Sequence, residues 1–141
     1  MSKLSNSGVH RLGTASVLIV EDDTDTAELY ALWLRSEGHR VSVMSDAARA
    51  LILSPVLRPT VAVLDIGLPG LDGLELVSRL RRLPQLAECQ YIAVTAYSDA
   101  RLQSRCRAAG FSTFLKKPMT RETLVGSVLT ASLPIERARY N

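Results

Sequence analysis

The sequence predicts an α/β fold in which helices cover both faces of a parallel sheet. From about residue 16 onward, short apolar runs rich in β-branched residues alternate five times with segments of helical periodicity. The clearest of these runs are continuous rather than alternating, as in strands that are buried on both faces. Because connections between parallel strands are right-handed, this alternation predicts a doubly wound sheet with a helix after each strand.

Five segments carry the strand pattern. Two of them, residues 17–20 and 61–64, are uninterrupted apolar runs that an acidic residue follows directly. The segment at residues 40–44 is more polar, which is typical of an edge strand. The predicted strands, in chain order, are residues 17–20, 40–44, 61–64, 91–94 and 113–115.

Each predicted helix is bounded by residues that favour helix ends. We expect Asp23, Ser98 and Thr120 to be N-caps, because their side chains can accept a hydrogen bond from an amide of the first turn. We expect Ser54-Pro55 to end the second helix and Gly110 to end the fourth. The predicted helices are residues 24–37, 46–53, the stretch from residue 74 to Pro84, residues 98–110 and residues 120–133. The residues expected to face inward on the last helix are Leu124, Val125, Val128 and Leu129.

The composition indicates one globular domain. The chain has 141 residues, of which 47% are hydrophobic and 22% are charged, so that a sizeable core is available. No apolar run approaches the ~20 residues needed to cross a bilayer, and the polar first residues contain no signal-peptide core. We therefore expect a cytoplasmic protein without membrane insertion, divided into a flexible leader at residues 1–15, a folded domain at residues 16–133 and a tail at residues 134–141.

Charge and cysteine content argue against several classes of function. The formal net charge is +3 at pH 7, but the basic residues are dispersed and no nucleic-acid-binding motif accompanies them. We therefore expect no direct contact with nucleic acid. Cys89 and Cys106 are too few for a disulfide framework and lack metal-ligand spacing. Cys106 falls on the apolar stripe of a predicted helix, where a buried and inert thiol is expected.

Charged and hydroxyl side chains follow the predicted strands at the points where the strands end. In a doubly wound fold the site lies beyond the carboxyl ends of the strands, so these side chains should converge at one edge of the sheet. The residues are Glu21, Asp22 and Asp23 after the first strand, Asp65 after the third, Thr95 after the fourth, and Lys116 and Lys117 after the fifth.

This set of side chains favours phosphoryl transfer assisted by a metal ion. Clustered carboxylates repel one another unless a cation lies among them, and Mg²⁺ prefers a few carboxylate oxygens together with water and phosphate. A lysine can pair with a phosphoryl oxygen, and an aspartate can be the nucleophile that forms an acyl phosphate. The sequence therefore predicts a phosphoryl site that uses Mg²⁺.

Other ligands of doubly wound folds do not suit the same loops. A dinucleotide site requires G-x-G-x-x-G after the first strand, where this chain has Glu-Asp-Asp-Thr. A P-loop requires a glycine-rich turn that ends in Lys-Ser or Lys-Thr, and the sequence contains none. Carboxylates after the first strand would repel the phosphate of FMN.

Four segments, taken in order, resemble the receiver domain of two-component response regulators. The resemblance covers about residues 16–133 and implies a flavodoxin-like doubly wound (βα)5 fold, with a five-stranded parallel sheet in the order 2-1-3-4-5. The matching segments are residues 17–23 (Val-Leu-Ile-Val-Glu-Asp-Asp), residues 63–73 (Val-Leu-Asp-Ile-Gly-Leu-Pro-Gly-Leu-Asp-Gly), residues 92–96 (Ile-Ala-Val-Thr-Ala) and residues 114–118 (Phe-Leu-Lys-Lys-Pro).

The resemblance implies a role for each acidic position. Glu21 and Asp22 correspond to the acidic pair that holds Mg²⁺. Asp65 corresponds to the phosphoacceptor, which shares an oxygen with the metal, and the backbone carbonyl of Gly67 corresponds to a further metal ligand. Asp23 is better explained as the N-cap of the helix that begins at residue 24.

The resemblance also implies a set of residues that respond to phosphorylation. Thr95 corresponds to the hydroxyl that moves toward the phosphoryl group, and Lys117 to the lysine that completes the catalytic set with Asp65 and Thr95. Phe114 corresponds to a rotating aromatic switch, although an aromatic in an apolar strand is equally well explained as core. The resemblance further implies a cis Lys117–Pro118 bond.

Two positions depart from the commoner pattern of the family. Gly67 has no side chain two residues beyond the acceptor, and Tyr97 places a ring two residues beyond Thr95. The resemblance implies that these positions tune hydrolysis of the acyl phosphate.

These observations predict a signalling domain that catalyses only its own phosphorylation and dephosphorylation. A histidine kinase or a histidine phosphotransfer protein would supply the phosphoryl group. The face formed by the last two helices and the fifth strand would then bind a downstream effector or a second copy of the chain. Two alternatives are a receiver fold that binds partners without phosphate and a phosphatase, which would want a second aspartate where Gly67 lies.

Overall fold

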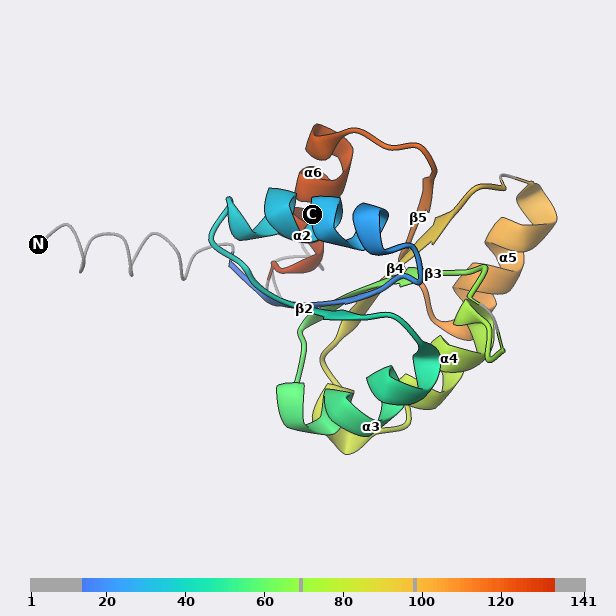
Figure 1. Ribbon diagram of the computed structural model, residues 1–141. Coiled ribbons are helices and arrows are strands. Elements are labelled where there is room, and N and C mark those ends of the chain that lie inside the picture. The colour runs from blue at the N-terminus through green and yellow to red at the C-terminus, as the bar shows by residue number, and fades with distance from the viewer. Residues whose placement is uncertain (1–13, 69, 98, 134–141) are drawn as a thin grey trace, which may run out of the picture.

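A computed structural model describes residues 14–68, 70–97 and 99–133. The expected leader and tail therefore lie mostly or wholly outside the described residues. Five parallel strands form one sheet in the order β2-β1-β3-β4-β5, which confirms the flavodoxin-like α/β prediction (Figure 1). The strands are β1 (Ser16–Val20), β2 (Arg40–Met44), β3 (Val61–Asp65), β4 (Gln90–Thr95) and β5 (Thr113–Lys116).

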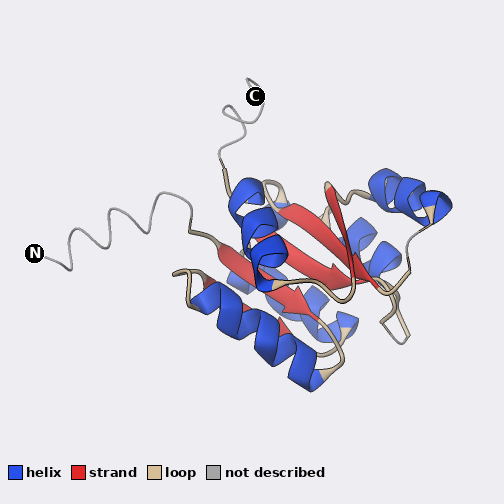
Figure 2. Cartoon of the chain, turned by 90° about the horizontal axis from the view of Figure 1, so that it is seen from above, coloured by secondary structure: helices blue, strands red, loops and turns tan. Residues whose placement is uncertain are grey.

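Helices lie on both faces of the sheet, with α2 and α6 above it and α3 and α4 below it in Figure 1. Seen from above, some helices lie in front of the strands and others behind them (Figure 2). One buried cluster joins the sheet to α2 and α6, and a second joins the opposite face to α3, α4 and α5. The elements are α2 (Thr24–Arg35), α3 (Ala47–Leu57), α4 (Gly73–Leu80), the short 3₁₀ helix η1 (Pro84–Leu86), α5 (Ala100–Ala109) and α6 (Arg121–Ala131).

The central strands explain why their sequences are continuous apolar runs. Side chains alternate between the two faces of a strand. Val17 and Ile19 of β1 therefore pack with α2 and α6, while Leu18 and Val20 pack with α3 and α4. Because helices cover both faces, every one of these positions is buried.

The helix caps follow the sequence closely, with one shift. Asp23 caps α2 and Thr120 caps α6, as predicted, and Gly110 ends α5 with a φ of 128°. The prediction of Ser98 as the cap of α5 is wrong, because Asp99 takes that position and accepts the Leu102 amide at 2.7 Å. Ser98 itself lies outside the described residues.

The predicted end of α3 at Ser54-Pro55 is also wrong. The helix continues through Pro55 to Leu57, although proline lacks the amide hydrogen that would bond to the preceding turn. Tertiary packing outweighs this loss, since Leu51 and Leu57 pack against the buried cluster on their face of the sheet. The helix ends at Arg58, whose amide donates to the Ser54 carbonyl at 2.8 Å.

The last helix buries a narrower stripe than predicted. Leu124 and Val128 are fully buried and Val125 is half-buried, but Leu129 is 47% exposed. Positions 124 and 128 are one helical turn apart on the same stripe, whereas position 129 lies further around the helix. The expectation that Leu129 faces inward was therefore wrong.

Cys106 is buried, as predicted, and Cys89 is buried as well. The Lys117–Pro118 bond is cis, as the family resemblance implies. Burial raises the pKa of the Cys89 thiol to about 12 and also raises the pKa of Cys106, so both remain protonated at neutral pH. Across residues 14–68, 70–97 and 99–133, none of the helices combines the length and the apolar character that a membrane span requires.

Two leucines of α2 test this division between core and surface. Leu34 is fully buried, whereas Leu32, two residues earlier, is 64% exposed. We expect Leu34→Ala to lower the free energy of unfolding by about 2–5 kcal/mol, because it removes buried methyl groups and leaves a cavity. Leu32→Ala should change it by less than about 0.5 kcal/mol. Urea denaturation of both variants would contradict the fold if their losses were equal.

Candidate phosphoryl site

The register of the sheet brings the two main carboxylates together. Val20 of β1 pairs with Leu64 of β3, so that the residues which follow them, Glu21 and Asp65, lie side by side at the carboxyl edge. Glu21 is 3% exposed and Asp65 is 9% exposed. Two carboxylates at the end of a buried sheet are electrostatically unfavourable unless positive charge balances them.

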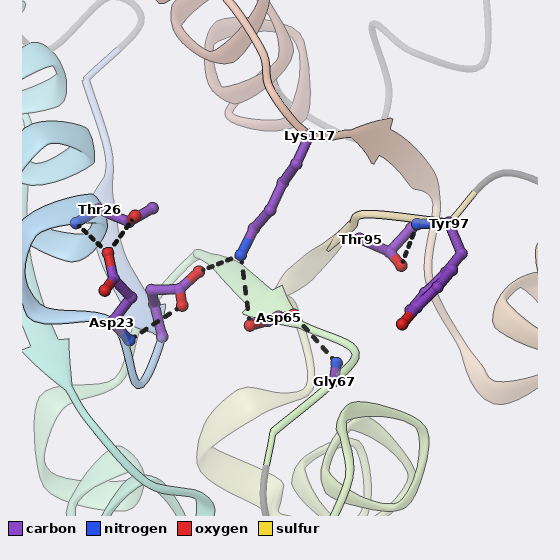
Figure 3. A network of polar contacts seen from close by, with 8 residues as sticks. Asp23, Thr26, Asp65, Gly67, Thr95, Tyr97 and Lys117 are labelled. Atoms are coloured by element: carbon purple, nitrogen blue, oxygen red, sulfur yellow. Dashed lines mark hydrogen bonds and ion pairs between the residues drawn. The ribbon is translucent and has the colours of Figure 1, made fainter.

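Lys117 supplies part of that positive charge. Its Nζ lies 2.8 Å from Glu21 Oε1 and 3.4 Å from Asp65 Oδ2, and Figure 3 shows it reaching across from the end of β5 to Asp65. The Lys117 amide donates to the Thr95 carbonyl at 2.7 Å, which fixes the start of this segment beside β4. Lys117 is thus far from Glu21 and Asp65 in the sequence, but its ammonium group lies between their carboxylates.

Backbone amides hold the remaining carboxylate oxygens. Glu21 Oε2 accepts the Asp23 amide at 3.1 Å, and Asp65 Oδ1 accepts the Gly67 amide at 3.0 Å. The tight loop after β3 thus orients Asp65, while the start of α2 orients Glu21. The Asp23 side chain serves the helix cap instead, where it accepts from the Thr26 amide at 2.9 Å (Figure 3).

The acidic cluster has the spacing of a candidate metal site. Glu21, Asp22 and Asp65 each offer a ligand oxygen, and these oxygens all lie within 4.8 Å of one another. Oxygens bound to one Mg²⁺ lie about 2.0–2.1 Å from the ion, so small side-chain movements would let all of them reach it. Asp22 is exposed, which leaves the cluster open to solvent on one side. The donor set fits a hard divalent cation.

The electrostatics of the cluster favour an additional cation. Burial raises the pKa of Glu21, and the charge of Asp65 adds to this, although hydrogen bonds from Lys117 and the Asp23 amide act in the opposite direction. For Lys117, burial alone would lower the pKa, but its hydrogen bond to Glu21 and the charge of Asp65 outweigh burial and raise it. The ammonium therefore stays charged at neutral pH, yet it does not fully balance the buried carboxylates.

Thr95 ends β4 at the same edge of the sheet as the acidic cluster, and Phe114 lies within β5. Thr95 is 2% exposed, and its Oγ1 accepts the Tyr97 amide at 3.1 Å (Figure 3). Within the described part of the chain, no hydrogen bond links the Thr95 hydroxyl to Asp65 or Lys117. Phe114 is half-buried and packs with the apolar core cluster between the sheet and α3, α4 and α5. The Tyr97 ring is 70% exposed.

One neighbour of the cluster was not anticipated from the sequence. Tyr30 of α2 is 5% exposed, and burial raises the pKa of its phenol. The charges of Lys117, Glu21 and Asp65 also act on this phenol, so it lies within their electrostatic reach. An aromatic at helical spacing has the same sequence pattern in the core as beside a charged site, so the sequence alone does not separate the two positions for Tyr30. The direct Lys117–Glu21 ion pair was not anticipated either.

Comparison with known proteins identifies the class to which this geometry belongs. The family model for the response regulator receiver domain matches residues 17–129. The chain therefore belongs to the response regulator receiver domain family, which confirms the resemblance seen in its motifs. Membership places it in two-component signalling, where a histidine kinase is the general partner.

Two relatives differ in how much of their length the chain matches. The chain is 36% identical over 108 residues to an uncharacterized 14.6 kDa protein in the sodA1 3′ region of Leptolyngbya boryana, and the match covers 77% of this chain and 82% of that protein. It is also 36% identical over 109 residues to a cyclic di-GMP phosphodiesterase of Thermotoga maritima, of which the match covers only 28%. The chain thus spans about a quarter of the second relative.

Solved structures agree with the fold. A putative response regulator from Chloroflexus aurantiacus is 30% identical, with a TM-score of 0.78 over 84% of this chain and 97% of that one. The receiver domain of a sensor histidine kinase from Pseudomonas aeruginosa PAO1 is 27% identical, with a TM-score of 0.75 over 83% of this chain and 95% of that one. That structure has a magnesium ion coordinated in its active-site cleft.

Metal binding can be tested without any phosphoryl donor. We expect Mg²⁺ to raise the unfolding temperature saturably, because an ion that binds only the folded state stabilises it. Asp65→Asn should weaken Mg²⁺ binding at least about tenfold, since it removes one charged ligand. Asp25→Asn is the matched control, because Asp25 is exposed in the first turn of α2 and lies outside the cluster. Equal Mg²⁺ responses of the two variants would place the ion elsewhere.

Proposed function

We propose that this chain is a phosphorylatable receiver in which Asp65 accepts a phosphoryl group from a phosphohistidine of a cytoplasmic kinase or phosphotransfer protein. The observation that supports this most is the arrangement around Asp65. Its carboxylate lies 3.4 Å from the Lys117 ammonium and within 4.8 Å of ligand oxygens from Glu21 and Asp22. A nucleophile, a cationic partner and a metal-ligand set are thus present together at an open edge of the sheet.

The transfer step follows from these positions. An Asp65 carboxylate oxygen attacks phosphorus, a new O–P bond forms, and the N–P bond of the phosphohistidine breaks. The imidazole nitrogen keeps the bonding electrons and takes a proton from solvent. The Gly67 amide holds the Asp65 side chain in one orientation during the attack. Positioning and charge neutralisation account for most of the catalysis in such transfers.

The proposed metal site uses Glu21, Asp22, Asp65 and the carbonyl of Gly67. When bound, Mg²⁺ would neutralise charge that develops on the phosphoryl oxygens. Lys117 would exchange its contact with Asp65 for one with a phosphoryl oxygen, because the acceptor oxygen loses its negative charge when the acyl phosphate forms. Its contact with Glu21 at 2.8 Å keeps the ammonium within the cluster during that exchange.

The proposed switch begins at Thr95. Its hydroxyl currently accepts the Tyr97 amide, but its own hydrogen remains available to a phosphoryl oxygen. Movement of Thr95 would open space on β4 beside β5, into which the half-buried Phe114 ring can turn. The face formed by α5, β5 and α6 would then change its binding properties. Gly67 and Tyr97 are the positions proposed to set the lifetime of the acyl phosphate.

The charge of that face indicates which kind of effector it suits. The sequence has no acidic residue from Ala100 to Arg121, and the exposed Glu122 in the first turn of α6 offsets only one of the cations of this face. Lys116 lies on the same side of β5 as Phe114, because side chains alternate along a strand. A second copy would bring like charges together in a symmetric interface, which disfavours a homodimer through this face. An effector protein with an acidic segment fits better. The exposed cations are Arg101, Arg105, Arg107 and Lys116.

The two alternative functions receive less support. A partner-binding module that works without phosphate has no need of a complete set of acceptor, lysine and metal-ligand oxygens. A phosphatase that turns over would want a second aspartate two residues after the nucleophile, where this chain has Gly67. We therefore propose a signalling domain that catalyses only its own phosphorylation and dephosphorylation.

A small phosphodonor tests the acceptor directly. With Mg²⁺ and acetyl phosphate, we expect one alkali-labile, acid-stable phosphoryl group per chain, detected by intact-mass spectrometry. Asp65→Asn should abolish labelling, because an amide oxygen is a poor nucleophile and leaves no acyl phosphate. Asp25→Asn should label like the wild type. Labelling that persists in Asp65→Asn would remove the acceptor assignment, and multiple turnover of a phosphomonoester would instead support a phosphatase.

The proposed switch makes a separate prediction. Thr95→Ala should still become phosphorylated, but the NMR shifts that phosphorylation causes at Phe114 and along α5 should shrink, because the hydroxyl that follows the phosphoryl group is missing. Thr130→Ala, an exposed threonine of α6, serves as the control. Shifts of unchanged size at Phe114 in Thr95→Ala would show that Thr95 does not couple the site to this face.

A further inference from the structure

The amino edge of the sheet, opposite the carboxylates, carries its own group of charged side chains. Because the strands are parallel, Ser16 and Arg40 begin β1 and β2 at this edge, and Thr60 immediately precedes β3. The Thr60 amide donates to the Ser16 carbonyl at 2.8 Å, and the Arg40 amide donates to the Ala15 carbonyl at 3.0 Å. These backbone contacts fix the spacing of the three positions.

Two adjoining pockets open at this edge. The first has a volume of about 420 Å³ and the second about 560 Å³, and they share Ser16 and Arg40. Arg58 lines the first pocket, and Arg35 lines the second. Among residues 14–68, 70–97 and 99–133, no aspartate or glutamate lines either of them. The described lining of the pockets therefore combines several guanidinium groups with hydroxyl groups and no carboxylate.

The guanidinium groups of Arg40 and Arg58 have no partner within the described residues. Neither takes part in a hydrogen bond or an ion pair there, and both residues are exposed. Glu37, the acidic residue nearest to Arg40 in sequence, pairs with Arg121 of α6 instead. Arg35 donates to the Val41 carbonyl at 2.9 Å, which holds its side chain along the edge strand. Positive charge in this region is thus left without compensation.

The backbone conformation of Arg58 is unusual for a residue with a long side chain. It caps α3 in the left-handed conformation, with a φ of 49°, and it is the one described non-glycine residue with a positive φ. Glycine or asparagine usually occupies such a cap, because a larger side chain crowds the backbone. Outliers of this kind cluster at ligand-binding sites, so the position of this side chain is worth following. At this position the side chain lines a pocket that already contains Arg40.

We propose that the first pocket binds a phosphate-bearing small molecule, with Arg40 and Arg58 contacting its phosphate oxygens and the hydroxyls of Ser16 and Thr60 lining the rest. Planar guanidinium groups suit the geometry of phosphate, and pockets of about 300–1,000 Å³ hold ligands of nucleotide size. This site is independent of the proposed function, because it lies at the opposite edge of the sheet from Asp65. Free phosphates and phosphate esters share this chemistry.

A ligand titration distinguishes these sources and tests the site. The full chain is kept in EDTA, so that the carboxylate cluster stays free of metal and repels anions. Inorganic phosphate, pyrophosphate and AMP are added at constant ionic strength, and the unfolding temperature and amide NMR shifts are recorded. We expect saturable stabilisation, with shifts centred on Ser16, Gly38 and Thr60. Tighter binding of AMP than of phosphate would identify an ester, and the reverse would identify a free phosphate.

Substitutions of the pocket arginines test whether binding occurs at this pocket. Arg58→Gly should weaken binding at least about tenfold, yet unfold at no lower temperature than the wild type without ligand, because glycine accepts this φ freely. Arg40→Gln should weaken binding similarly, and Arg58→Lys should restore part of it. Arg49→Gln removes the same charge from the exposed first turn of α3, outside both pockets, and should bind like the wild type. Equal binding by all variants, or stabilisation that follows ionic strength alone, would overturn the proposal.

Discussion

The structure depends on how the buried carboxylates of Glu21 and Asp65 are balanced at the end of the sheet. Their desolvation is unfavourable, and the Lys117 ammonium, 2.8 Å and 3.4 Å away, offsets only part of it. Burial is the largest cause of the raised Glu21 pKa, and it outweighs the hydrogen bonds from Lys117 and the Asp23 amide. We therefore expect this site to gain stability from a divalent cation and to respond when the charge on Asp65 changes.

The parallel sheet creates this situation and supports it. Register alone makes Glu21 and Asp65 neighbours, since the residues that precede them are paired between β1 and β3. Both strands are buried on both faces, so neither can shift to relieve the repulsion without exposing apolar side chains. The site is thus rigid beneath and open above, where Asp22 and Tyr97 are exposed. That combination suits a group that must be reached by a partner protein and must report a change in charge.

Much of this arrangement could be predicted from the sequence, because the fold has simple local signals. Continuous apolar runs predicted the buried strands, and the residues directly after them predicted the cluster of Glu21, Asp65 and Lys117. The errors have separate causes. Packing of Leu51 and Leu57 carries α3 past Pro55, and two adjacent cap-forming residues shifted the start of α5 from Ser98 to Asp99. Tertiary contacts decide the first case, whereas in the second case neighbouring residues have similar preferences for the N-cap.

Other features needed three-dimensional positions. The proximity of Tyr30 to the charged cluster depends on how α2 lies over the sheet. The left-handed conformation of Arg58 depends on where α3 ends, which the sequence placed too early. Glu37 pairs with Arg121, which is far from it in the chain. This pairing leaves Arg40 without an acidic neighbour. Long-range pairings of this kind leave no periodic pattern.

The central claim, that one divalent ion belongs among these carboxylates, is tested most directly with a paramagnetic ion. Mn²⁺ can replace Mg²⁺ at an oxygen-ligand site, and it broadens the NMR signals of amides close to it. We predict that substoichiometric Mn²⁺ broadens the amides of Glu21, Asp22, Asp65 and Gly67 first, and that excess Mg²⁺ reverses this. Broadening centred elsewhere, or spread evenly over the acidic surface, would contradict the claim.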